Sequence, residues 1–212
     1  MDGSVTVVMT YRPALAFARR AKEWHEATAR LDSPHGMGEP PMLVLLYSLL
    51  SLEAFISEEL SDRRQPPEYH HLYRSNVSLA QRWAKATDLL KASTSPAQHA
   101  VTAITAACQD TGLFGLLVRT RNKLIHPRLY VEVGDASGDR IDDDSLERLI
   151  KDLQAPPVSL PYFSAAFPGM VTCAASARWS RSTLATMVRL FFDAVAETLP
   201  QEWLNVLPDQ DV

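Results

Sequence analysis

The residues best suited to chemistry in this sequence are an arginine and a histidine five positions apart, Arg121 and His126. A guanidinium is permanently charged and presents a planar fork of donors that suits a phosphate, whereas an imidazole exchanges a proton near neutral pH. A fixed cation beside a proton-transfer group is sufficient for cleaving RNA without a metal ion. The pair therefore makes this segment the first candidate for an active site.

The segment around the pair is basic, although the formal net charge of the 212-residue chain is −4. No acidic residue occurs between Asp110 and Glu132. The basic residues of this stretch are Arg119, Arg121, Lys123 and Arg128. An acidic total argues against a protein whose whole surface neutralises phosphates, but it allows one basic patch. We expect Arg119, Lys123 and Arg128 to contact RNA beside the candidate active site.

Helix geometry decides whether Arg121 and His126 can meet. Five residues at about 100° each place them roughly 140° apart on a straight helix, so they would not share a face. Pro127 disfavours the helical conformation for the residue before it, and the helix is expected to end at His126. The histidine can then swing beneath the preceding turn, near the negative pole of the helix, which favours its protonated form.

The periodicity of apolar residues predicts an all-α bundle with four to five main helices in a single domain, residues 1–212. The first three predicted helices are Pro13–Leu31, Met42–Asp62 and Ser78–Leu90; in the fourth, Ala97–Cys108 leads into Gly112–His126, and the last is Ala175–Leu199. The second helix is expected at the centre of the bundle, and Ser78 is expected to cap the third. The proline-containing segments Asp32–Pro41 and Arg63–Val77 are interpreted as connections, and Pro96 as a separator.

A small insertion, residues 128–177, is predicted before the last helix. Leu129–Val133 alternates like a short strand, and Asp144 with Glu147 resembles the capping box of a short helix that runs to Leu153. Gln154–Met170 is rich in proline and uncharged, so we expect an irregular segment. The predicted insertion is therefore irregular with some β-structure.

The order Arg121-Asn122-x-x-x-His126 at the end of a bundle helix, with Leu52–Ile56 and Glu58–Leu60 on an upstream helix, resembles the HEPN superfamily. That family carries an arginine and a histidine separated by four to six residues. The resemblance implies a helical homodimer in which two motifs face each other across the interface. It also implies a metal-independent endoribonuclease that needs no cofactor and acts as a toxin or in defence against phage, with an antitoxin or another defence protein as a partner.

The resemblance also assigns roles to three residues. Arg121 would stabilise the charge that builds on the phosphorane, His126 would act as general acid or base, and Asn122 would orient the pair. The nucleophile would be the ribose 2′-hydroxyl, which restricts the substrate to RNA. The insertion would then select the substrate.

Glu53 is predicted to support this site. Leu49, Leu50 and Ile56 lie one turn away, so its carboxylate would be costly if it were buried without a partner. Arg121 is the expected partner, and the alternative is that Glu53 reaches solvent at an edge of the bundle. We therefore expect Glu53→Ala to be more harmful than Glu58→Ala.

Other interpretations of the same residues stay open. The chain could be a catalytically silent HEPN-like module that binds RNA, a nucleotide or a partner protein, or a helical scaffold in which Arg121 lies on the surface and His126 caps a helix. His70, His71 and Glu68 are interpreted as a solvated linker and not as a metal site, so no metal ligands are predicted. Two distant cysteines, no export signal and no predicted transmembrane helix favour the cytoplasm.

Overall fold

All regular elements in the described part of the chain are helices. The computed structural model describes residues 12–30, 39–62, 77–89, 95–125, 151 and 173–208. The helices are α1 (Pro13–Ala29), α2 (Glu39–Asp62), α3 (Leu79–Leu89), α4 (Ser95–Ala107), α5 (Leu113–Ile125), α7 (Ala174–Val195) and α8 (Gln201–Leu204). The predicted all-α fold is confirmed for these residues.

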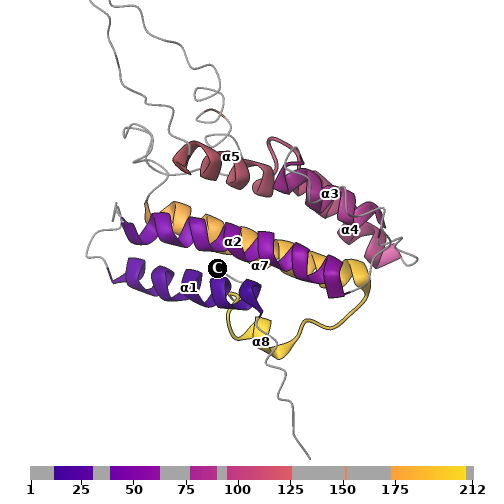
Figure 1. The fold of residues 1–212 in the computed structure, drawn as a ribbon, viewed down its shortest axis with the longest axis horizontal. Coiled ribbons are helices and arrows are strands. Elements are labelled where there is room, and N and C mark those ends of the chain that lie inside the picture. Colours follow the sequence, from indigo (N-terminus) through magenta and orange to yellow (C-terminus); the bar gives the residue numbers. More distant parts are fainter. Residues whose placement is uncertain are drawn as a thin grey trace, which may run out of the picture.

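The long helices α2 and α7 lie side by side at the centre of the bundle (Figure 1). Helix α1 packs against α2 and α7 on one side, where α8 also lies, and α3, α4 and α5 cover the other side. Helix α2 contacts α1, α3, α5 and α7, which confirms its predicted central position. The predicted basic segment is therefore carried on the opposite side of the central layer from α1.

Two helices begin earlier than the sequence predicted. Helix α2 starts at Glu39 and contains Pro40 and Pro41, and α4 starts at Ser95 and contains Pro96. The interpretation of Pro40 and Pro41 as part of a connection was therefore wrong, and Pro96, predicted to precede α4, lies in its first turn. A proline in the first turn lacks only an N–H group that has no acceptor within the helix, and its fixed φ suits the helix.

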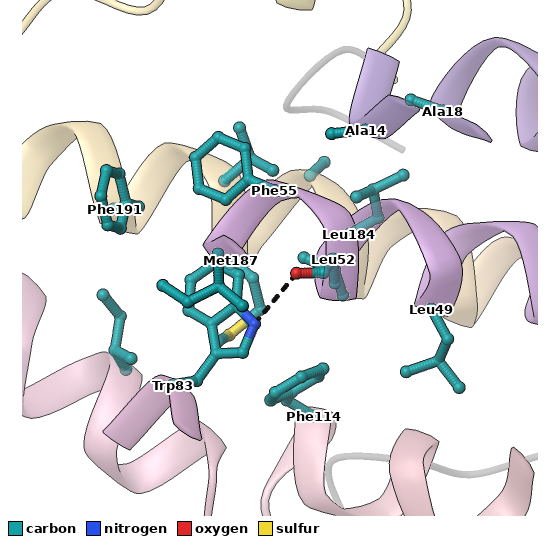
Figure 2. Close-up of a cluster of buried hydrophobic side chains, with 14 of the residues drawn as sticks. Ala14, Ala18, Leu49, Leu52, Phe55, Trp83, Phe114, Leu184, Met187 and Phe191 are labelled. Atoms are coloured by element: carbon teal, nitrogen blue, oxygen red, sulfur yellow. Dashed lines mark hydrogen bonds between the residues drawn. The ribbon is translucent and has the colours of Figure 1, made fainter. Parts of the chain in front are cut away.

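A cluster of aromatic rings joins the two sides of the bundle (Figure 2). Phe55 of α2 stacks on Trp83 of α3 with 5.7 Å between the ring centroids, and Phe191 of α7 meets Phe55 edge-on at 5.0 Å. The indole Nε1 of Trp83, which is fully buried, donates a hydrogen bond to the carbonyl oxygen of Leu52 at 3.2 Å. This bond fixes the position of α3 against α2, because a buried indole N–H needs a partner.

The turn between α4 and α5 depends on close backbone contacts. A Cβ atom on Gly115 would lie 1.9 Å from the carbonyl oxygen of Gln109, and one on Gly112 would lie 2.3 Å from that of Ala106. Glycine is therefore required at both positions for the present geometry. These contacts set the start of α5, the helix that carries Arg121.

The C-terminal part of the bundle differs from the prediction. Helix α7 ends at Val195 and not at Leu199, because Ala196 adopts the left-handed conformation with φ of 56°. The chain then forms α8, which was not predicted and which buries Trp203. The buried Arg181 of α7 donates hydrogen bonds to the carbonyl oxygens of Ala18 and Val206 and so links α1, α7 and the chain after α8.

Within the described ranges, one helix has the length and composition of a membrane span. Pro40–Leu60 of α2 has a mean hydropathy of 1.5, and half of the residues in that window are buried inside the bundle. The core helix of a soluble protein meets the same criterion, so the finding is weak evidence for a membrane span.

Several predicted features lie outside the described residues. They include the strand at 129–133, the proline-rich segment 154–170 and, apart from the exposed helical residue Lys151, the short helix at 144–153. The predicted insertion ended at residue 177, whereas α7 already begins at Ala174. The predicted end of the insertion at residue 177 therefore falls inside α7.

Candidate functional site

Helix α5 carries four of the residues predicted to handle RNA. Arg119, Arg121, Asn122 and Lys123 all belong to its last two turns. His126 follows directly after the last residue of the helix in sequence, and both His126 and Arg128 lie outside the described residues. The structure thus describes the arginine half of the Arg121/His126 motif.

Arg121 and Asn122 border a cavity of about 290 Å³ between α2, α3 and α5. Among the described residues, those with polar or charged side chains that line it are Glu53, Ser78, Arg82, Arg121 and Asn122. The apolar ones are Leu49, Leu50, Val77, Leu79 and Val118. A volume of about 300 Å³ lies at the small end of ligand-binding clefts, and a mixed apolar and cationic lining suits a ligand that has both a flat apolar part and an anionic part.

Asn122 is the hydrogen-bond partner of Arg121 within this cavity. The guanidinium Nη1 of Arg121 donates to the amide Oδ1 of Asn122 at 3.1 Å. Arg121 is half-buried, and Asn122 is exposed. The contact uses one edge of the arginine and restrains the direction of its fork.

Glu53 is paired with a different arginine from the one predicted. Its Oε1 lies 3.9 Å from Nη1 of Arg82 on α3, and its side chain is 45% exposed. The expected pairing of Glu53 with Arg121 was therefore wrong, and the carboxylate reaches solvent, as the alternative had it. Glu53 lies at the edge of the cavity, where water reduces the cost of its charge, and Arg121 borders the same cavity without an ion pair to it.

The packing of α3 against α2 explains why Arg82 is the partner. Trp83 bonds to the carbonyl of Leu52, and the residues that form the ion pair are their sequence neighbours, Arg82 and Glu53. The hydrogen bond between Trp83 and Leu52 therefore brings Arg82 close to Glu53. No sequence pattern had pointed to Arg82 as a residue of the site. Arg82 lies next to a tryptophan on a helix with a predicted cap, which indicated that it is held in place, but nothing in the sequence indicated where α3 crosses α2.

The amino end of α3 forms part of the cavity wall. Ser78 Oγ accepts a hydrogen bond from the amide of Gln81 at 3.2 Å, and Gln81 Oε1 accepts one from the amide of Ser78 at 3.0 Å. This capping box confirms the predicted cap and fixes the start of α3 at Leu79. The first turn contains no acidic residue, so the partial positive charge of the helix end faces the cavity without an acidic neighbour on α3.

Arg119 also has a structural contact. Its Nη1 donates to the carbonyl oxygen of Asp110 at 3.3 Å, across the turn between α4 and α5. The side chain therefore stabilises the turn that precedes α5. Lys123 is half-buried near the end of the same helix.

Other chemically capable groups in the described ranges lie outside this cavity. Burial raises the pKa of the Cys108 thiol to about 12, so Cys108 is protonated at neutral pH and is a poor nucleophile. Burial, with smaller contributions from Arg181 and Arg178, lowers the pKa of His25 on α1, and its Nδ1 has no hydrogen-bond partner. Within the described ranges, no three His, Cys, Asp or Glu residues are grouped to hold a metal ion.

Comparison of the chain with protein-family models, curated proteins and solved structures gives no match. The resemblance to the HEPN superfamily therefore stays a prediction from the sequence motif.

Proposed function

We propose that this protein is a HEPN-type endoribonuclease that cleaves RNA without a metal ion. The observation that carries the proposal is the position of Arg121 and Asn122 in a cavity that combines cationic side chains with an apolar wall. His126, the second half of the motif, follows α5 directly in sequence. Function as a toxin or in defence against phage belongs to the same proposal and comes from the family resemblance alone.

The residues of the cavity suit a nucleotide. Leu50, Leu79 and Val118 are among the apolar side chains against which a base or ribose could lie, and the guanidinium of Arg121 offers a donor fork to the phosphate. In this scheme Asn122 keeps the fork of Arg121 directed at the phosphate. Positioned donors of this kind stabilise charge that develops in a transition state.

The proposed reaction is an internal transesterification. The ribose 2′-hydroxyl attacks the adjacent phosphorus and loses its proton to a base, while the bond from phosphorus to the 5′-oxygen breaks and that oxygen gains a proton. The products are a 2′,3′-cyclic phosphate and a 5′-hydroxyl. A homodimer would supply two copies of His126, one to accept the first proton and one to donate the second.

The test is expression of the wild-type protein, Arg121→Ala and His126→Ala in cells, followed by inspection of total RNA. We expect RNA fragments with the wild type and intact RNA with both variants. Arg19→Ala is a matched control, because Arg19 is an exposed arginine of α1 on the opposite side of the bundle. Its RNA pattern should equal that of the wild type.

The same experiment separates the enzyme from the alternative function. If the wild type leaves total RNA intact, yet the purified protein binds RNA and Arg121→Ala does not, the chain is an RNA-binding module. Cleavage that survives both substitutions contradicts the proposed site. For the dimer, light scattering of the wild type should give twice the mass of the chain, and cleavage by a monomer contradicts the composite site.

A further inference from the structure

We infer that Arg82 is a second phosphate-binding residue of the proposed RNA site, contributed by a different helix from the one that carries the Arg121/His126 motif. The inference rests on the proposed function, because it takes RNA as the ligand of the cavity. It adds a residue that lies 39 positions before Arg121 in sequence and that the motif does not include.

Position is the first argument. Arg82 from α3 and Arg121 from α5 line the same cavity of about 290 Å³, so a ligand of nucleotide size that contacts one guanidinium is close to the other. The Arg82 side chain is only 13% exposed. A cation that is largely removed from water interacts more strongly with an anion than a cation on an open surface does.

The arrangement around Arg82 is the second argument. Trp83 is anchored in the core by its bond to Leu52, and Glu53 contacts the Arg82 guanidinium at one nitrogen, at 3.9 Å. The N–H donors of a guanidinium form a planar fork that matches the oxygens of a phosphate. Glu53 is then a positioning residue, which holds the fork of Arg82 at the cavity wall.

Charge is the third argument. The described residues that line the cavity include two arginines and one carboxylate, Glu53, and the amino end of α3 adds a partial positive charge. The charge of these described groups is positive in balance, although the chain as a whole is acidic. The apolar residues that complete the lining favour a ligand that joins phosphate to a base, as a single-stranded RNA does.

Binding of a short single-stranded RNA with 2′-O-methyl riboses tests the inference, because this probe has no free 2′-hydroxyl and cannot be cleaved by the proposed reaction. Fluorescence anisotropy gives the dissociation constant of the full chain at several salt concentrations. We expect Arg82→Ala to weaken binding about tenfold or more. The slope of log K against log salt should fall by about 0.7, the value for one lost phosphate contact on a single strand.

Two further variants keep the test decisive if Arg82→Ala does not fold. Arg82→Lys keeps the charge but loses the fork, so it should bind more weakly than the wild type with an unchanged salt slope. Arg82→Gln should lose both affinity and slope. The matched control Arg19→Ala should retain the affinity and the slope of the wild type. Wild-type affinity and slope in the folded Arg82 variants overturn the inference.

Cleavage of an ordinary RNA, assayed in parallel, separates this inference from the proposed function. Cleavage by the wild type together with unchanged binding by Arg82→Ala refutes the role of Arg82 and leaves the ribonuclease intact. Binding that depends on Arg82 without any cleavage refutes the ribonuclease and leaves a phosphate-binding site. A wild-type protein that neither binds nor cleaves RNA overturns both.

Discussion

Glu58 of α2 accepts a hydrogen bond from the backbone amide of Ala14 in α1, with 2.8 Å between Oε1 and N. The amide groups of the first turn of a helix lack acceptors within the helix, and Arg12, at the N-cap of α1, makes no side-chain capping bond. A carboxylate from the neighbouring helix therefore caps α1. Its negative charge also lies at the positive end of the helix dipole.

This contact predicts that Glu58→Ala destabilises the fold more than Glu53→Ala, the reverse of the order expected from the sequence. Loss of the cap should cost about 1–2 kcal/mol. The ion pair of Glu53 is partly exposed, and pairs of this kind contribute about 0–1 kcal/mol. Urea unfolding of both variants measures the difference. An equal or larger loss for Glu53→Ala would restore the original order.

The proposed chemistry predicts how substitutions at Arg121 and His126 differ. Arg121→Lys should cleave RNA nearly as poorly as Arg121→Ala, because an ammonium keeps the charge but loses the planar fork. His126→Ala should lower the rate by about 10²–10⁴-fold if the imidazole transfers a proton. Rates measured with purified protein, together with thermal unfolding of each variant, provide the comparison.

Product analysis completes this prediction. Cleavage should persist in the presence of a chelator, leave a 2′,3′-cyclic phosphate and spare DNA, which lacks the attacking hydroxyl. A requirement for added metal ion or cleavage of DNA contradicts the mechanism.

The environment of His25 predicts a loss of stability in mild acid. Burial, followed by the charges of Arg181 and Arg178, lowers the pKa of His25 below its ordinary value of 6.5, and Glu26 opposes this shift in part. As the pH falls through 6.5, the unfolded chain takes up a proton more readily than the folded one, so the free energy of unfolding decreases. The contribution of His25 to the free energy of unfolding is fully present above pH 6.5 and is lost as the pH falls towards the pKa of His25 in the folded state.

Thermal unfolding between about pH 7.5 and 5.5, the range in which histidine ordinarily titrates, tests this effect. The melting temperature of the wild type should fall more over this range than that of His25→Gln, because the glutamine at position 25 does not titrate. Parallel curves for the two proteins would contradict the assignment to His25.

The end of α7 predicts a stabilising substitution. Ala196 has φ of 56°, and the amide of Glu197 donates to the carbonyl oxygen of Phe192 at 3.0 Å, the bond pattern of a helix end that usually carries glycine. Ala196→Gly should raise the free energy of unfolding by about 1 kcal/mol, because glycine adopts this conformation without a steric penalty. Ala103→Gly, in the middle of α4, is the opposite control and should lower it by a similar amount. A loss of stability in both variants would refute the prediction.

The sequence predicted the helices from their own residues but not the contacts between helices. The periodicity that ends at Asp62 and the capping residue Ser78 predicted the end of α2 and the start of α3. The ion pair between Glu53 and Arg82 depends on where α3 crosses α2, which is set by the core position of Trp83. Helix α8 has only four residues, too few for any periodicity to register.

Sequence patterns pointed to only some of the residues that line the candidate cavity, because such patterns describe one segment and not the contacts between helices. Arg121 and Asn122 were identified from their spacing with His126, which is a property of one segment. The cavity also needs Arg82 from α3 and Leu49 from α2, and no local pattern joins residues from three helices.

The central position of α2 has a consequence for the synthesis of the chain. Helix α2 ends at Asp62 and its central neighbour α7 begins at Ala174, so about 110 residues are translated between them. At about 5–20 residues per second, roughly 5 to 20 seconds pass between the synthesis of α2 and the start of α7, which packs against it. During that interval the most apolar helix of the described chain lacks its longest neighbouring helix on the ribosome. Slower folding at this stage would favour aggregation of nascent chains, so the yield of soluble protein should depend on expression temperature and on chaperones that bind apolar helices.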